Sequence, residues 1–490
     1  MTYQNVYVSD MKVFTSMYLF IIVERKGFLV FSQHLKKAIV ILVAVMMLFA
    51  LFTGCTGKED NAEEATTSTE AKQQSTVEST AKQKEPVTLT VFSDANRAET
   101  QGTLEVIRLF EEKTGIKVKY NPIPGTNDER LQKIDIALMS GDTTDLIFSS
   151  ESYLNKVGLA ELALRLNDII KKDKEYDAIK VHGKYLPTYN NGGIYGLPLD
   201  KNDFAVFYNK KIFDDAGVPY PDGTWTWDEY IETAQKLTDP AKGIYGSYMP
   251  IYPQMRHIKA NMAGISAYKE DGTSNFGDPV FTEGLQFYKD LGEKYKIQPT
   301  LIEQKLKKMG SFEFMNGKYG MIFINSWYFT PITDLNKYPR DWKIGVAVTP
   351  KFNDIENNCN FGSASFLVVN KNSLHPEEAY EYAKFSALNY YLYDKKLPAI
   401  ENISEEEMRP ILEEVEKGTN GEITVKDLYK AYFDNGLGYS SEMITGIIGS
   451  EYINIFSQES ELYLSGDIPL QETVDNVVRR ANQAIEKVNK

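Results

Sequence analysis

Hydrophobic and polar residues alternate over residues 87–92, which is the pattern of a half-buried β-strand. Apolar positions then recur at helical spacing over 104–110, and alternation resumes over 116–120. A second helix is predicted over 128–139 and a second buried strand over 145–148. This alternation of strands and helices predicts an α/β fold, in which helices cover the faces of a parallel or mixed sheet.

Polar side chains follow two of these strands directly. In open α/β sheets, ligands bind in the crevice beyond the carboxyl ends of the strands. We therefore expect ligand contacts from both polar clusters, although a solvated turn or a helix cap would use the same residue types. The residues concerned are Asp94, Asn96, Arg97, Ser149 and Glu151. Asp145 stands just before a buried strand, and we expect a structural role for it.

The first 55 residues contain a basic and apolar segment that ends at a cysteine. Lys36 and Lys37 precede an unbroken apolar run over 38–52, and small residues lead to Cys55. A basic flank, a short apolar core and a small-residue cut site are typical of a secretion signal. The cysteine after the cut site resembles the lipobox of bacterial lipoproteins, which implies acylation of Cys55 and a globular part outside the cytoplasmic membrane. An uncleaved transmembrane anchor is the alternative, but the run is slightly short for one.

These features divide the chain. Residues 1–55 are predicted to be a leader and lipoprotein signal peptide, and residues 56–86, which lack aromatic residues, a disordered tether. About 400 residues remain, with all four tryptophans, which is enough for two α/β lobes.

The net charge argues against one class of partner, and the cysteine content argues against disulfide bonds. The formal net charge is −14, and the leader has more basic than acidic residues, so the rest of the chain is more acidic still. Such a surface repels nucleic acid, so we expect no nucleic-acid partner. Cys359 is the only cysteine besides Cys55, so no disulfide framework is expected.

Six short motifs follow one another in a fixed order. They are FEEKTGIKV at 110–118, YGLP at 195–198, FYNK at 207–210, AGVP at 216–219, WTWDE at 225–229 and FMNGKYGM at 314–321. In order and spacing the chain resembles the bacterial extracellular solute-binding proteins of family 1. Within that family it looks most like the sugar-binding, maltose-binding-like subunits of ABC importers, and the resemblance runs from Val87 to the end.

The resemblance implies a type II periplasmic-binding-protein-like fold. Two lobes, each a mixed sheet flanked by helices, would close on a ligand about a hinge of several chain crossings. Lobe 1 would contain residues 87–200 and 351–390, and lobe 2 residues 204–346 and 396–490. We expect a monomer that needs no cofactor.

A sugar presents flat apolar faces and a rim of hydroxyls, so its site needs aromatic rings and hydrogen-bonding side chains. Trp327 matches the tryptophan that this family stacks on sugar, with Tyr328 beside it, although core packing is the alternative for Trp327. Trp225 and Trp227 are expected to pack a helix on its sheet. The remaining expected contacts lie at the hinge and in later loops: Asp200, Asp203, Gly362, Ser363 and Tyr439.

The resemblance implies a binding protein and no enzyme. The expected function is a lipid-anchored, extracellular subunit that captures a carbohydrate, with an oligosaccharide as the expected ligand, and delivers it to an ABC permease in the cell membrane. A secreted carbohydrate-active enzyme is the alternative, because two carboxylates suffice for a glycosidase. A ligand-sensing receptor on the same fold is another. The sequence has none of the familiar hydrolase, phosphate-loop or calcium-loop motifs, and the histidines outside the leader, His182, His257 and His375, do not suggest a metal site.

Overall fold

The structure, a computed structural model, describes residues 87–189 and 192–488. The chain divides into two compact units, residues 1–81 and 82–490, and all the described residues lie in the second. The predicted signal peptide, the predicted lipidation site Cys55 and the predicted tether lie outside the described residues. Among the described helices, none combines the length and apolar character that a membrane span requires.

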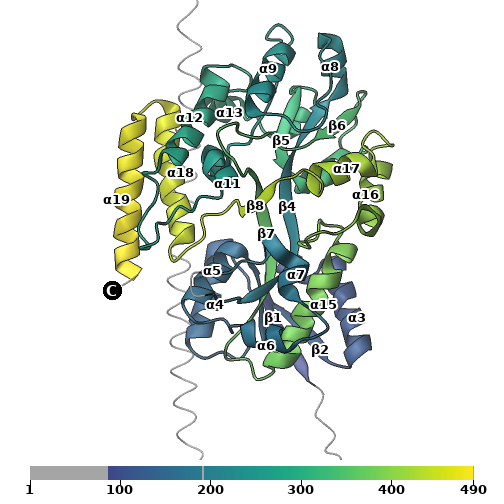
Figure 1. Cartoon of the computed structure of the whole chain (residues 1–490), viewed down its shortest axis with the longest axis vertical. Helices are drawn as coiled ribbons and strands as arrows, with labels where there is room; N and C mark the ends of the chain where they lie inside the picture. The colour runs from purple at the N-terminus through teal and green to yellow at the C-terminus, as the bar shows by residue number, and fades with distance from the viewer. Residues whose placement is uncertain (1–86, 190–191, 489–490) are drawn as a thin grey trace, which may run out of the picture. The chain divides into compact units, whose positions relative to one another are not determined.

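The strands form a mixed sheet in the order β2-β1-β3-β7-β4-β5, with β6 paired to β4 and β8 paired to β7 (Figure 1). β1 is parallel to β2 and β3, whereas β7 is antiparallel to β3 and β4. The strands are β1 Thr88–Ser93, β2 Lys117–Pro122, β3 Leu146–Ser150, β4 Gly196–Asn209, β5 Met321–Asn325, β6 Ile344–Ala347, β7 Cys359–Val369 and β8 Gly438–Ser441.

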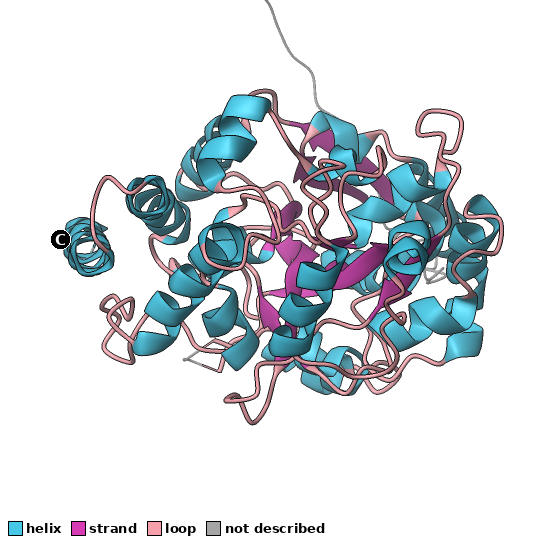
Figure 2. Ribbon diagram, turned by 90° about the horizontal axis from the view of Figure 1, so that it is seen from above, coloured by secondary structure: helices cyan, strands magenta, loops and turns pink. Residues whose placement is uncertain are grey.

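Helices surround the strands, as the view from above shows (Figure 2). Up to residue 263 they are α2 Ala95–Ala98, α3 Gln101–Thr114, α4 Asn127–Met139, α5 Glu151–Leu159, α6 Asn167–Lys172, α7 Ala178–His182, η1 Gly183–Tyr185, α8 Lys210–Ala216, α9 Trp227–Leu237, α10 Pro253–Arg256 and α11 Ile258–Ala263. The later ones are α12 Pro279–Glu293, α13 Leu301–Lys307, η2 Ser311–Phe314, η3 Ser326–Tyr328, α14 Phe329–Thr333, α15 Pro376–Asp394, α16 Glu405–Gly418, α17 Val425–Tyr432, α18 Gly449–Ser465 and α19 Leu470–Val488.

The local predictions for the first strands and helices are confirmed. β1, α3, β2, α4 and β3 follow one another as the hydrophobic pattern predicts. The Asp145 carboxylate has the expected structural role, because it accepts hydrogen bonds from the Thr90 N–H at 2.8 Å and from the Ser373 hydroxyl at 2.7 Å. It thereby ties β1 to the loop after β7.

The start of α9 also follows the sequence prediction. The Thr226 hydroxyl accepts from the Glu229 N–H, and the Glu229 carboxylate accepts from the Thr226 N–H, which is a capping box. Trp225 and Trp227 are both buried in the core, and the Trp225 indole donates to the Val348 carbonyl at 2.8 Å. These tryptophans therefore pack the helix on the sheet, as expected.

β4 joins two groups of core residues. Its first part, with Leu197 and Leu199, packs with β1, β3, α3 and α15, whereas Phe204 and Val206 pack with β5 and α9. The change falls at the polar residues 200–203, which lie at the predicted boundary between lobe 1 and lobe 2. The predicted lobe boundaries at 200, 351, 390 and 396 stay a prediction.

Candidate functional site

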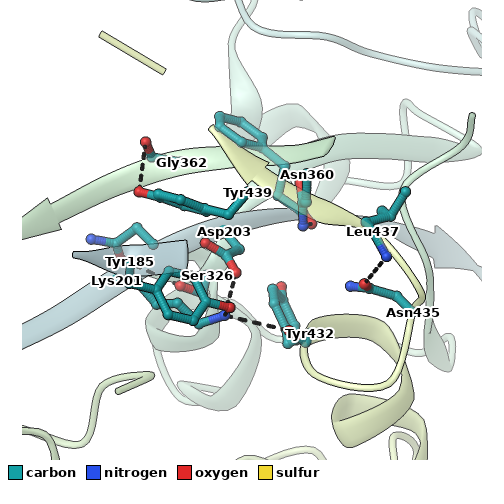
Figure 3. A network of polar contacts seen from close by, with 12 residues as sticks. Tyr185, Lys201, Asp203, Ser326, Asn360, Gly362, Tyr432, Asn435, Leu437 and Tyr439 are labelled. Carbon is teal, nitrogen blue, oxygen red and sulfur yellow. Dashed lines mark hydrogen bonds and ion pairs between the residues drawn. The ribbon is translucent and has the colours of Figure 1, made fainter. Parts of the chain in front are cut away.

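The candidate site lies where β4, β7 and β8 run side by side (Figure 3). Gly362 of β7 stands opposite Asp203 of β4 on one side and opposite Ser441 of β8 on the other. This register brings together four residues that the sequence placed in the ligand site, from three segments far apart in the chain. They are Asp203, Gly362, Ser363 and Tyr439.

Gly362 allows this close approach of backbones. A Cβ atom at this position would lie 2.2 Å from the Asn202 carbonyl oxygen, so a side chain cannot fit without moving a strand. The Gly362 carbonyl accepts hydrogen bonds from the Glu442 N–H at 2.7 Å and from the Tyr439 hydroxyl at 3.3 Å. The glycine thus anchors the end of β8 to β7.

A charged pair is buried beneath Tyr439. The Lys201 ammonium donates to the Asp203 carboxylate and, at 2.7 Å, to the Tyr185 hydroxyl; Lys201 is 0% exposed and Asp203 2%. Burial alone would lower the pKa of Lys201, but the Asp203 carboxylate and the Tyr185 hydroxyl outweigh burial and raise it. Asp203 Oδ1 has no hydrogen-bond partner among the described residues. One buried acceptor therefore remains free beside the pair.

Two further carboxyl groups approach the same place. Glu151 begins α5, and Glu442 follows β8. Burial raises the pKa of Glu151 to about 7, against an opposing hydrogen bond with Ser441. Burial also raises the pKa of Glu442 to about 7, against opposing hydrogen bonds with Ser363 and Gln254. Near neutral pH, both protonation states of each group are therefore populated. The carboxylate only accepts hydrogen bonds, whereas the protonated carboxyl also donates one.

A cavity of about 430 Å³ opens beside Glu151. Its walls combine aromatic rings, hydroxyl groups and glycine backbone, with Tyr189, Tyr268, Ser266 and Thr445 among its residues. One oxygen of Glu151 and the hydroxyl of Tyr189 lack hydrogen-bond partners among the described residues. Buried polar groups are normally satisfied, so two without partners in residues that line a cavity are suited to a ligand that brings its own donors and acceptors. We call this cavity the Glu151 crevice.

Arg97 and Asp200 belong to a separate charge cluster. The Arg97 guanidinium lies 3.7 Å from the Asp200 carboxylate and 3.2 Å from that of Asp394, and Lys396 lies 3.6 Å from Asp200. Asp200 is fully buried, and neither of its oxygens makes a hydrogen bond to the described residues. The Lys201 N–H donates to the Leu397 carbonyl at 2.8 Å, so this cluster lies near residues 200–204 and 390–396, where the chain passes between the two predicted lobes.

Trp327 and Tyr328 lie in η3, directly after β5. The Trp327 indole is half-buried and contacts Phe312 and Tyr328, with ring centroids 6.1 and 5.2 Å apart. Ser326 next to it donates to the Asn202 side chain at 3.3 Å, which places η3 beside the polar run of β4. Tyr328 is fully buried and donates to the Ser311 carbonyl at 2.7 Å, so its ring is part of the core. Trp327 is not among the residues that line the Glu151 crevice.

The other expected contacts have local partners. Asp94 caps α2 by accepting from the Arg97 N–H at 2.8 Å, and Asn96 is exposed on that helix. Ser149 is buried and donates to the Ser150 carbonyl at 3.0 Å. The structure therefore does not bring Asp94, Asn96 or Ser149 into the Glu151 crevice.

Several residues of this region were missing from the expected contacts. They are Tyr185, Tyr189, Lys201, Gln254 and Glu442. Lys201 stands between two predicted contacts, and its place in the polar run could have indicated it. For the tyrosines and Glu442 the sequence holds no comparable signal, because their burial and partners arise only from the strand register.

The region is suited to binding by hydrogen bonds. Among the described residues, no group of three or more His, Cys, Asp or Glu side chains has the arrangement to hold a metal ion. Burial raises the pKa of Tyr185 and of Tyr439, so both hydroxyls stay protonated and can donate. Carboxyl groups, phenols and serines together give a ligand both donors and acceptors.

Comparison with known sequences identifies the family. Residues 94–389 match the sequence profile of the bacterial extracellular solute-binding proteins. A relative from Pyrococcus horikoshii, described as an uncharacterized ABC transporter extracellular-binding protein, is 26% identical over 379 residues, which is 72% of this chain and 78% of the relative.

Solved structures show the same fold. The ABC substrate-binding protein Lmo0181 from Listeria monocytogenes, in complex with cycloalternan, has a TM-score of 0.64 at 22% identity, covering 82% of this chain and all of that one. The sugar-binding protein MalE from Xanthomonas citri has a TM-score of 0.66 at 17% identity, covering 82% and 98%. The predicted type II periplasmic-binding-protein-like fold is thereby confirmed.

Proposed function

The chain belongs to the bacterial extracellular solute-binding proteins, and we propose that it captures a carbohydrate outside the cytoplasmic membrane and delivers it to an ABC permease. The expected ligand is an oligosaccharide. Lobe closure about the predicted chain crossings near residues 200–204, 346–351 and 390–396 would enclose it, because a ligand that binds the closed state more tightly shifts the protein toward that state. The family and the fold support transport, and the sugar-binding neighbour supports the ligand class.

The carbohydrate proposal rests on the lining of the Glu151 crevice. One oxygen of Glu151 and the hydroxyl of Tyr189 lack hydrogen-bond partners among the described residues, and Tyr268 contributes an aromatic ring. Sugars combine hydroxyl groups with apolar C–H faces, so they match both kinds of wall. A thermal-shift screen of the whole protein against neutral sugars tests this, since a ligand that binds only the folded state raises the melting temperature.

Two results would overturn the proposal. One is stabilisation by peptides or polyamines in that screen with no effect of any sugar. The other is the appearance of products when the protein is incubated with an oligosaccharide, which would favour a carbohydrate-active enzyme. Binding of a sugar without turnover supports a transport subunit, as expected for a family of binding proteins.

We further propose that Trp327 stacks on a sugar ring. Replacing it by alanine should weaken sugar binding by about 1 kcal/mol, because an aromatic surface is lost while the half-buried position leaves the core intact. Calorimetry with the sugar found in the screen measures the affinity. Tyr220→Ala, which truncates an exposed aromatic residue after α8, is the control and should bind like the wild type. Should Tyr268→Ala weaken binding while Trp327→Ala does not, the stacking ring is Tyr268.

Lipid anchoring is a separate proposal that rests on the sequence around Cys55. A thiol is required for acylation, so Cys55→Ser should move the protein from the membrane fraction to the soluble fraction of cells that export it. Cys359→Ser, which removes the other thiol, should leave the protein at the membrane. Membrane retention of the Cys55→Ser chain would indicate an uncleaved transmembrane anchor instead.

A further inference from the structure

A second, smaller cavity adjoins the Glu151 crevice. It has a volume of about 220 Å³ and shares Glu151, Ser266 and Thr445 with the crevice, so the two spaces meet at these residues. It extends to His257, which lies between α10 and α11. We call it the His257 pocket. Its volume is far larger than a single ordered water requires.

His257 has unused hydrogen-bonding capacity. The residue is 2% exposed, its ring packs edge-on against Phe456 with centroids 5.3 Å apart, and neither Nδ1 nor Nε2 has a hydrogen-bond partner among the described residues. Burial lowers the pKa of His257 to about 4, against smaller opposing effects of weak hydrogen-bond contacts with the Asn261 side chain and with the residue's own backbone. The neutral imidazole offers one donor and one acceptor. A buried ring whose nitrogens make no well-formed hydrogen bond costs free energy unless something in the pocket pairs with it.

The rest of the lining is polar and lacks cationic side chains. Asn261, Ser440 and Ser441 contribute amide and hydroxyl groups, and Glu151 contributes the carboxyl at the junction with the crevice. The lining contains no Lys or Arg. A carboxylate or phosphate in this pocket would meet Glu151 without a compensating positive charge, whereas a hydroxyl group could pair with every polar residue present.

We propose that the His257 pocket is a subsite for one neutral, hydroxyl-bearing unit of the ligand, in which His257 donates one hydrogen bond and accepts another. The inference rests on the proposed carbohydrate function and extends it. The adjoining part of the ligand lies in the Glu151 crevice, and Glu151 contacts both this part and the unit in the His257 pocket. The subsite selects neutral sugars and rejects uronic acids and sugar phosphates.

Calorimetry with the whole protein tests the subsite. The probes are glucose, galactose, xylose, arabinose, maltose and maltotriose, together with glucuronate and glucose 6-phosphate. We expect a neutral probe to bind the wild type, and His257→Phe, which keeps an aromatic ring against Phe456 but removes both nitrogens, to raise its dissociation constant at least tenfold. His375→Phe, at the partly exposed N-cap of α15, is the control and should bind like the wild type.

Two further measurements distinguish a lost ligand contact from a disturbance of the fold by the His257→Phe change. Ser266→Phe places a ring at the exposed junction of the two cavities and should also weaken binding at least tenfold, without disturbing buried packing. In NMR spectra of the wild type, the ¹⁵N resonances of the His257 ring should shift when the neutral probe is added. A purely structural histidine would not respond in this way.

The possible results separate the two proposals. If a neutral sugar binds the wild type and the His257→Phe and Ser266→Phe chains equally well, the subsite is overturned and the carbohydrate function stands. If glucuronate or glucose 6-phosphate binds as tightly as glucose, the charge selection is wrong. If no neutral sugar binds the wild type, both the subsite and the carbohydrate function are overturned, and the His257 pocket holds water alone.

Discussion

Replacing Asp203 by alanine is expected to lower the free energy of unfolding by about 3–5 kcal/mol. The change leaves the Lys201 ammonium fully buried with the Tyr185 hydroxyl as a partner but without its counter-charge. Desolvating an ion costs several kcal/mol, and here the opposite charge no longer offsets that cost. Chemical denaturation followed by circular dichroism, without ligand, measures the loss.

A matched control tests whether burial of the ion pair causes the expected loss of stability. Asp215→Ala breaks the Lys211–Asp215 pair, in which both side chains are more than half exposed, and should cost less than about 1 kcal/mol. The double variant Lys201→Met with Asp203→Leu removes both charges and should recover most of the stability lost in Asp203→Ala. Equal losses for Asp203→Ala and Asp215→Ala would show that the Lys201 charge reaches water in solution.

Replacing Glu442 by glutamine is expected to stabilise the protein at about pH 8 by about 1–3 kcal/mol, and to change little at about pH 4. Burial raises the pKa of Glu442 to about 7, whereas in the unfolded chain the group titrates near its ordinary value. Between these two values the folded protein holds a proton that the unfolded chain has lost. Wild-type stability therefore falls as the pH rises through this range, and the penalty is fully present above it.

Glutamine cannot ionise, so Glu442→Gln should reduce this fall while Glu151 keeps its own contribution. Because the two groups are close enough to influence one another, the slope reports on the pair. Denaturant unfolding at a series of pH values gives the comparison. Glu451→Gln, at an exposed position of α18, is the control and should reproduce the wild-type curve. Parallel curves for wild type and Glu442→Gln would mean that Glu442 is hydrated in solution.

Much of the local structure follows from short segments of sequence. Periods of 2 and 3.6 residues locate β1, α3, β2, α4 and β3, because the same side chains that set the period also become buried. The capping box at Thr226 and Glu229 forms through contacts within one turn, so no distant part of the chain is needed to predict it.

The individual site residues were harder to predict. Tyr328 looked like a second aromatic contact beside Trp327, but its ring packs between Phe207 and Phe314. Adjacent residues in a turn point in different directions, so proximity to Trp327 in the sequence does not place Tyr328 at a cavity. Arg97 and Asp200 were expected at the ligand. In the structure they share a charge cluster with Asp394 and Lys396, and their contact with a ligand stays a prediction.

The sequence by itself determined the family and the type II fold, because the order and spacing of its short motifs already resemble those of that family. The tertiary structure alone decided which polar groups meet. Asp203, Gly362 and Ser441 stand side by side through the register of β4, β7 and β8, and the two cavities meet at Glu151 between segments distant in the chain. Burial and unsatisfied hydrogen bonds depend on every neighbour in space, and these neighbours cannot be read from positions along the chain.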